Sequence, residues 1–334
     1  MTAWRPAPWS RANAALCCLW MPSLGPPRRL APLLAALACL ATASAICAGP
    51  AAAASRVRAS QGATASSAVQ EAERVSRYWT PARMRSTPPL DGATAGSGDG
   101  LATASFARVP DATVAPYSVN GRLFVRQGGE RGYCSATAIN SASRQLVLTA
   151  GHCVNTGPEG PGGRSAWSSY LEFVPAYSGS LAPFGAFVAR RNAIFSPKPW
   201  IKRGNPNFDL GAFLTEPNAN GQNVADAVGG GATIVTNLDR HEQFQTFGYP
   251  GATTQMNTCE SPYTGDDNVT YSLAGPPTQA IRCHWIPGAS GGGWLIAGGT
   301  EIDGLTSYGL RTDKVHTFGP YFGSGNVGAL VAGL

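Results

Sequence analysis

Charged side chains and histidines are scarce in this chain of 334 residues. Only 13% of the residues are Asp, Glu, Lys or Arg and only four are histidines, whereas glycine occurs 41 times. From Val119 to the end, no segment shows a sustained helical stripe of apolar residues. These absences exclude a bundle of long, solvated helices and favour short elements joined by many turns.

The formal net charge of +6 does not indicate a nucleic-acid partner, because the positive excess is confined to the N-terminal third. Residues 1–110 hold eleven arginines and four acids, a net charge of +7. Residues 111–334 hold fourteen Lys and Arg and fifteen acids, a net charge of −1. The larger part of the chain therefore lacks the basic surface that binds a polyanion, and we expect no nucleic-acid partner.

Residues 1–48 have the features of a secretory signal. Two arginines precede an apolar stretch that begins at Leu30, and the small residues "ASA" end at Ala45. This order predicts export, with no membrane attachment in the mature form. A membrane anchor is the alternative, because the weakly apolar run continues to Ala48. Met21 is a second candidate for the initiating residue, since the stretch before it is unusual for a signal.

Residues 49–110 are rich in Ala, Ser, Thr, Gly and Pro and contain few large apolar side chains. Such a composition buries too little surface to offset chain entropy, so we expect these residues to be either largely disordered or a pro-segment, that is, a low-complexity pro-segment or linker. The stretch "AVQEAERVSRYWTPARM" at 68–84 interrupts it and predicts a short helix that ends before Pro81. This stretch either packs on the domain that follows or has no structural role.

Short β-prone runs fill the rest of the chain. They are "GRLFVR", "SATAI", "QLVLTA", "LEFVPAY", "FGAFVAR", "DLGAFL", "ATIVT", "QFQTFGY", "GGWLIA" and "IDGLTSY". Gly, Pro and Asn separate these runs at intervals of roughly ten residues, which is typical of an all-β barrel or sandwich. We therefore interpret residues 111–334 as one all-β domain.

Three motifs carry candidate catalytic side chains. His152 follows an apolar run in "LVLTAGHCV", Asp209 begins an apolar strand in "DLGAFL", and Ser290 lies among glycines in "PGASGGGWL". A carboxylate in apolar surroundings needs a partner, which an imidazole provides. Glycines beside a serine leave backbone N–H groups free to stabilise a developing oxyanion. Each motif alone also fits a structural role, but their joint occurrence in this order predicts nucleophilic catalysis by serine.

The string "GASGG" also matches the G-x-S-x-G elbow of α/β-hydrolases. That motif requires a helix after the serine and a histidine that follows it as partner. No helical pattern follows Ser290, and the order of the three motifs is the reverse of the one required. The sequence therefore does not support an α/β-hydrolase.

The strings "TAGHC", "DLGAF" and "GASGGGW" resemble the active-site motifs of the chymotrypsin-like serine peptidases, over roughly residues 115–334. "EFVPAY", "FGYP" and "GPYFG" resemble secreted trypsin-like and V8-like bacterial enzymes, and "YWTPARM" resembles a segment that precedes the domain in actinobacterial members. The resemblance implies an all-β fold of two six-stranded antiparallel Greek-key barrels, with the active site in the cleft between them. It also implies a monomeric serine endopeptidase that hydrolyses protein or peptide substrates without a cofactor.

The resemblance also assigns roles to individual residues. Ser290 matches the nucleophile, His152 the general base and Asp209 the carboxylate that orients the imidazole. The oxyanion hole is matched by the N–H groups of Gly288 and Ser290. The edge that pairs with the substrate backbone is matched by Ser307, Tyr308 and Gly309.

Four of the eight cysteines lie in or beside the leader, and the other four form an even set, which is typical of disulfides in an exported protein. The resemblance pairs Cys134 with Cys153, closing the loop that carries the histidine, and leaves Cys259 with Cys283. Zinc is the alternative for Cys259, Cys283 and the nearby histidines, but their spacing matches no compact ligand pattern, so we expect no metal.

Departures from the family pattern leave the substrate preference open. His284 stands where trypsin has the acid that selects Lys and Arg, and Thr306 stands where Glu-selective relatives have a histidine. Ala289 replaces the acid that commonly precedes the nucleophile, so we expect an oxyanion hole that packing forms in advance. A catalytically silent binding protein on the same fold is the alternative function.

Overall fold

The computed structural model describes residues 54–59, 65–92, 106–179, 181–251, 253–296 and 299–334. The predicted signal of residues 1–48, with its alternatives, lies outside these residues. No helix in the described part of the chain is long and apolar enough to cross a membrane.

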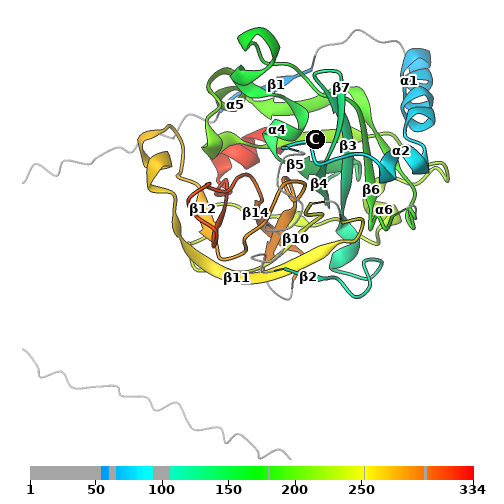
Figure 1. Cartoon of the computed structure of the whole chain (residues 1–334). Helices are drawn as coiled ribbons and strands as arrows, with labels where there is room; N and C mark the ends of the chain where they lie inside the picture. The colour runs from blue at the N-terminus through cyan, green and yellow to red at the C-terminus, as the bar shows by residue number, and fades with distance from the viewer. Residues whose placement is uncertain (1–53, 60–64, 93–105, 180, 252, 297–298) are drawn as a thin grey trace, which may run out of the picture. The chain divides into compact units, whose positions relative to one another are not determined.

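A closed six-stranded antiparallel barrel forms the first half of the domain (Figure 1). Its strands are β3 (Asn120–Gln127), β4 (Glu130–Ile139), β5 (Leu146–Thr149), β6 (Ser169–Pro175), β7 (Phe187–Pro197) and β8 (Gly211–Thr215). They pair in the order β7-β6-β3-β4-β5-β8, and β8 pairs with β7 to close the barrel. A short additional strand, β1 (Arg56–Arg58), pairs with β7.

The hairpin between β3 and β4 shows how the sequence sets the strand register. Gly128 and Gly129 have φ angles of 60° and 94°, and Gln127 pairs with Glu130 across the turn. A two-residue turn that matches the twist of its strands needs positive φ at both central positions, which glycine adopts without strain. The register of β3 against β4 therefore follows from the turn.

A second sheet forms the other half of the domain. Its strands are β9 (Thr233–Ile234), β10 (Gln243–Gly248), β11 (Asn257–Asp266), β12 (Gln279–Ile281), β13 (Gly293–Ile296), β14 (Glu301–Leu305) and β15 (Thr317–Gly319), with β2 (Ala107–Arg108) on β11. They pair in the order β15-β12-β11-β10-β13-β14-β9. Except for the parallel pair β9–β14, the described pairings of this sheet are antiparallel. The predicted all-β class is confirmed.

The helices are short compared with the sheets that they accompany. They are α1 (Ala65–Tyr78), α2 (Pro81–Arg85), α4 (Gly151–Val154), α5 (Lys198–Arg203), α6 (Val224–Ala227) and α7 (Ala329–Val331). The largest apolar cluster fills the first barrel with side chains such as Leu123 and Phe213 and continues into the second half at Ile302, and a smaller one surrounds Trp294. Burial of these side chains provides the main driving force for folding.

The segment before the domain is ordered where the structure describes it, which differs from the expected disorder of residues 49–110. α1 begins at Ala65 and ends at Tyr78, and a second helix, α2, begins at Pro81. The Thr80 hydroxyl accepts a hydrogen bond from the Arg83 N–H at 3.2 Å. Proline suits the first position of a helix because that position needs no N–H donor, so Pro81 starts α2 and does not simply end α1.

Large side chains attach this segment to the first barrel. Trp79 is buried, donates its indole N–H to the Tyr170 carbonyl oxygen at 2.6 Å, and lies 5.4 Å from Phe124 between ring centroids. Met84 is also buried. The stretch 68–84 therefore packs on the domain, which was one of its two predicted alternatives.

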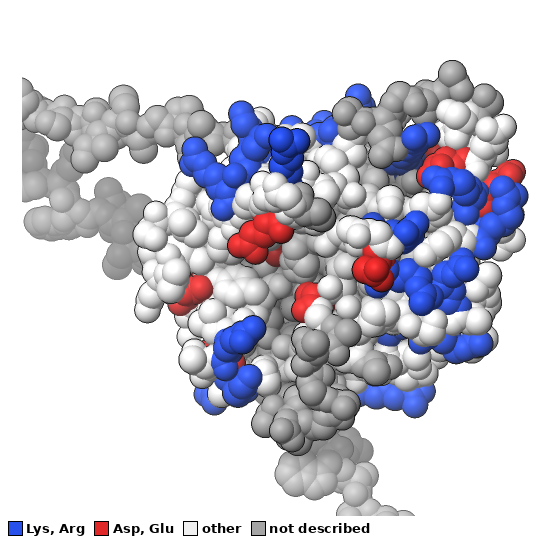
Figure 2. All heavy atoms as spheres, turned by 45° about the horizontal axis from the view of Figure 1, so that its top comes forward, with Lys and Arg blue, Asp and Glu red and all other residues white. Residues whose placement is uncertain are grey.

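Basic side chains gather on the side of the molecule that carries α1 and α2 (Figures 1 and 2). These two helices hold four arginines, and acidic side chains are interspersed on the same face. Part of the positive charge of residues 1–110 therefore lies on α1 and α2, which precede the predicted domain of residues 111–334.

Glu172 on β6 is buried, and its Oε2 has no hydrogen-bond partner among the described residues. Burial raises the pKa of this carboxyl from 4.5 to about 8. Between these values the unfolded chain releases a proton that the folded chain keeps, so the free energy of unfolding falls as pH rises, by up to about 1.4 kcal/mol per pH unit from this group.

We expect Glu172→Gln to remove this contribution, because the amide does not ionise. Chemical denaturation should show the variant gaining stability over the parent as pH rises from 4.5 to 8. Glu130→Gln, on the exposed start of β4, is the matched control and should follow the parent. If the free energy of unfolding changed with pH in the same way in Glu172→Gln and in the parent, the raised pKa of Glu172 would be wrong.

Candidate active site

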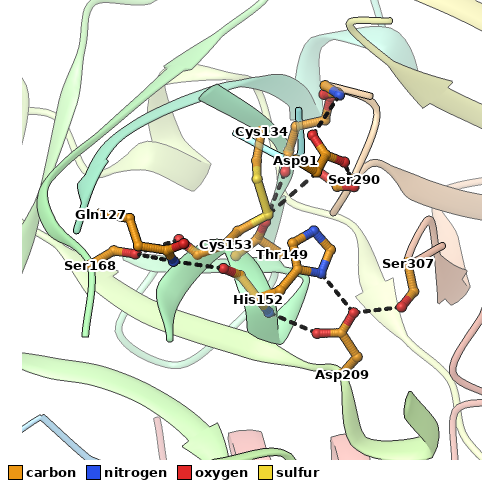
Figure 3. The surroundings of a disulfide bond; sticks show 12 residues. Asp91, Gln127, Cys134, Thr149, His152, Cys153, Ser168, Asp209, Ser290 and Ser307 are labelled. Carbon is orange, nitrogen blue, oxygen red and sulfur yellow. Dashed lines mark hydrogen bonds and ion pairs between the residues drawn. A yellow bond between two sulfur atoms is a disulfide. The ribbon is translucent and has the colours of Figure 1, made fainter. Parts of the chain in front are cut away.

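His152 lies in α4, directly after β5, and the disulfide Cys134–Cys153 joins this helix to β4 (Figure 3). The predicted pairings Cys134–Cys153 and Cys259–Cys283 are both confirmed. Gln127 adds a hydrogen bond from its amide nitrogen to the His152 carbonyl oxygen at 2.9 Å. The disulfide at Cys153 and the hydrogen bond from Gln127 therefore both restrict the backbone of His152.

Asp209 lies between a short 3₁₀ turn (Pro206–Phe208) and β8, and its carboxylate is buried. Oδ1 accepts the backbone N–H of His152 at 2.7 Å, and Oδ2 lies 2.8 Å from Nδ1 of the same residue. The Ser307 hydroxyl donates to Oδ2 at 2.5 Å. Gly151 permits this approach, because a Cβ there would lie 2.8 Å from Oδ1.

Ser290 lies in a loop that the first barrel holds in place. Ser135 on β4 donates its N–H to the Ser290 carbonyl oxygen at 2.8 Å and its hydroxyl to the Gly288 carbonyl oxygen at 2.9 Å. Gly288 and Gly291 have φ angles of 96° and 82°, and a Cβ on Gly288 would lie 2.6 Å from the Tyr249 carbonyl oxygen. The glycines predicted beside the serine are therefore required by the fold of the loop.

The segment after β14 brings its predicted residues to the same cleft. Ser307, Tyr308 and Gly309 all line it. Tyr308 is tied to the second sheet, since its hydroxyl donates to Asp267 at 2.7 Å and its ring stacks on Phe318 at 5.3 Å. Gly309 leaves the backbone open, because the nearest atom to a Cβ there would be 4.0 Å away.

Asp91 is a residue of the site that the sequence did not reveal. Its Oδ1 accepts the Gly288 N–H at 3.0 Å, and its Oδ2 accepts the Ser290 hydroxyl at 2.5 Å (Figure 3). Nε2 of His152 has no hydrogen-bond partner among the described residues. In the intact chain, the serine hydroxyl therefore donates to a carboxylate of the N-terminal segment.

His152, Ser290 and the segment 307–309 line one cleft of about 1380 Å³. His152 lies on the first-barrel side of it, and Ser290 and Ser307 come from the second-sheet half of the chain. Asp91 and His284 also line the cleft, so His284 is not remote from the site. The geometry brings together every side chain that the three motifs predicted.

The pKa of the His152 imidazole is higher than its ordinary value. Burial disfavours the imidazolium, but attraction to Asp209, its hydrogen bond and attraction to Asp91 outweigh this and raise the pKa from 6.5 to about 9. Burial likewise opposes ionisation of Asp209, yet its contacts with His152 and Ser307 hold the pKa of the carboxyl below its usual value. In the intact chain, these contacts with Asp209 and Asp91 therefore favour the imidazolium, whereas a general base has to be the neutral imidazole.

No metal site is supported in the part of the chain that the structure describes. The His/Cys cluster close enough to hold an ion there is Cys134, His152 and Cys153, and both of its cysteines are in a disulfide. Cys259 and Cys283 are likewise joined to each other, so they are not thiolate ligands. The residues of this cleft suit acyl transfer at a serine, which needs no metal.

No protein-family profile and no curated protein sequence matches the chain. Solved structures do match it. Protease Anisep from Arthrobacter nicotinovorans is 31% identical, with a TM-score of 0.54 over 62% of this chain and 90% of that one. The thermostable serine protease AL20 from an extremophilic microorganism is 29% identical, with a TM-score of 0.55 over 62% of this chain and 93% of that one.

A Glu endopeptidase is 20% identical with a TM-score of 0.54, over 70% of this chain and 95% of that one, and it supports the fold alone. The first barrel, the second sheet and the cleft between them define a protein of the chymotrypsin fold. With Anisep at 31% identity over 90% of its length, the chain belongs to the chymotrypsin-like serine protease family.

We expect the imidazole of His152 to titrate near pH 9 in the intact chain, because Asp209 and Asp91 both stabilise the imidazolium. NMR of the histidine ring signals, assigned with the variant His152→Gln, would measure the midpoint. A midpoint near the ordinary value of 6.5 would contradict the electrostatics described above.

Proposed function

We propose that the chain is a secreted serine endopeptidase that hydrolyses peptide bonds through an acyl-enzyme on Ser290. The observation that carries this proposal is that His152 and Ser290 line one cleft, with the imidazole held on the buried carboxylate of Asp209. Membership of the serine protease family supports the same reaction. No cofactor is needed, because the nucleophile, base and oxyanion donors are all groups of the chain.

The proposed mechanism uses the family chemistry on these residues. His152 takes the Ser290 proton at Nε2 as the Oγ attacks the substrate carbonyl carbon, and the N–H groups of Gly288 and Ser290 stabilise the resulting oxyanion. The imidazolium then gives the proton to the leaving amine, and water, activated by the same base, releases the acyl group. Asp209 acts as a positioning residue, since it fixes the tautomer and the ring orientation of His152.

We propose further that the edge at Ser307, Tyr308 and Gly309 pairs with the substrate backbone, which is supported by its place in the cleft and by the bare backbone at Gly309. Residues 1–48 act as the secretory signal, 49–110 as a pro-segment and 111–334 as the peptidase domain. Two disulfides support an oxidising compartment for the folded chain. Protein or peptide substrates are the expected partners of a monomer.

Ser290 and His152 should act as a unit. We expect Ser290→Ala and His152→Ala each to lower kcat against peptide substrates by several orders of magnitude, and the double variant to lose little more, because each residue is ineffective without the other. Ser272→Ala, an exposed serine of the second half, is the matched control and should retain activity.

Labelling with a serine-directed phosphonate separates this proposal from a silent binding protein. The proposal requires the label on Ser290 once residues before the domain have been removed. If the loss of kcat in the double variant equalled the product of the two single losses, Ser290 and His152 would not act together. A folded domain that takes no label would support the binding protein.

A further inference from the structure

Residues 86–92 lead from the end of α2 to the nucleophile, and Leu90, Asp91 and Gly92 line the cleft. Leu90 donates its N–H to the Tyr133 carbonyl oxygen at 2.9 Å, and the Tyr133 N–H donates to the Pro88 carbonyl oxygen at 3.0 Å. Pro89 forms an isolated parallel bridge with Tyr133. Pro88 and Pro89 lack N–H donors, so these two positions beside β4 leave no backbone donor unsatisfied.

Asp91 then places its carboxylate on the two groups that the proposed reaction needs. One oxygen accepts the Gly288 N–H, which is a proposed oxyanion donor, and the other accepts the Ser290 hydroxyl. The hydroxyl can donate only one proton, so while it bonds to Asp91 it does not bond to His152. Consistent with this, Nε2 of His152 is buried and has no partner among the described residues.

We infer that Asp91 is a built-in inhibitor: its carboxylate occupies the oxyanion site and holds Ser290 away from His152, so the intact chain is latent. The inference rests on the proposed function, because it takes Ser290 as the nucleophile. It goes further by naming the group that blocks the site and the two atoms on which it acts.

A side-chain carboxylate suits this role because it is not a substrate. Attack by Ser290 on its carbon would have to expel an oxide, which is a far poorer leaving group than the amine of a peptide bond. The negative charge also fits donors arranged for an oxyanion. Asp91 therefore occupies the site without being turned over. The residue as a whole remains exposed, so it can leave the site when the segment is released.

Residues 88–91 also pack closely on Gly132, which has no part in the proposed catalysis. Gly132 on β4 faces Leu90, and a Cβ on Gly132 would lie 2.8 Å from the Leu90 Cα, a main-chain atom. A methyl group at Gly132 would thus push residues 88–91 away from the cleft. Trp79 and Met84 would still hold the preceding helices on the first barrel.

The test measures how fast a small, neutral phosphonate labels Ser290 in the full-length chain, with mass spectrometry confirming that the labelled chain is intact. We expect Asp91→Ala to accelerate labelling roughly ten- to a hundredfold, in line with the loss of a charge-assisted hydrogen bond. Gly132→Ala should also accelerate labelling, although it changes neither Asp91 nor a catalytic group. Asp91→Asn should be intermediate, since its amide oxygen still accepts the Gly288 N–H.

Two matched variants serve as controls. Asp111→Ala removes an exposed aspartate that bonds only to Thr113 in the described chain, and Gly325→Ala adds a Cβ in open space. Both should label at the parent rate, and thermal unfolding should show all variants folded. A second readout is the titration of His152, which faces the carboxylates of Asp209 and Asp91. Its midpoint should fall in Asp91→Ala and stay unchanged in Asp111→Ala.

The outcomes separate this inference from the proposed function. If the parent labels as fast as Asp91→Ala and Gly132→Ala, the inhibitory role is wrong and the proposed function stands. If no chain labels, even after limited proteolysis has removed the N-terminal segment, the proposed nucleophile is wrong and the inference fails with it.

Discussion

The buried carboxylate of Asp209 is the constraint on which the rest of this site depends. It lies in an environment that penalises an unpaired charge, and three donors compensate for it: the N–H and ring nitrogen of His152 and the hydroxyl of Ser307. The two donors of His152 belong to the first barrel, while Ser307 follows β14 of the second sheet. One carboxylate therefore orients the imidazole and joins the two halves of the domain at the cleft.

Much of the fold and of the site could be predicted from the sequence. The ten predicted β-prone runs contribute to β3–β10, β13 and β14, because apolar residues bounded by turn formers specify strands locally. β11 was missed because "NTCESPYTGD" is largely polar, and pairing with both β10 and β12 together with the disulfide at Cys259 maintains it. The three motifs that the structure brings to one site could be proposed as catalytic because serine catalysis requires particular residue types, whereas Asp91 meets Ser290 only through the fold, across 199 positions of sequence.

The N-terminal segment shows why average composition does not predict which of its residues are ordered. Residues 49–110 hold few large side chains, but Val75, Trp79 and Met84 are among them, and all three are buried against the domain. A segment that cannot form a core of its own can still be ordered where a folded barrel already presents an apolar surface. β1 and β2 are ordered in a different way, because these two short strands pair through their backbones with β7 and β11.

The position of Asp91 also bears on Ala289. Trypsin-like relatives control the oxyanion hole with an acid next to the nucleophile, which pairs with a newly formed N-terminus. In this chain Ala289 is buried and carries no charge, so this side chain cannot pair with a newly formed N-terminus. Its shape is instead fixed by Ser135 and by the glycines, which fits a site formed in advance. Control of such a site has to come from outside the loop, and the acid that reaches Gly288 and Ser290 belongs to the N-terminal segment.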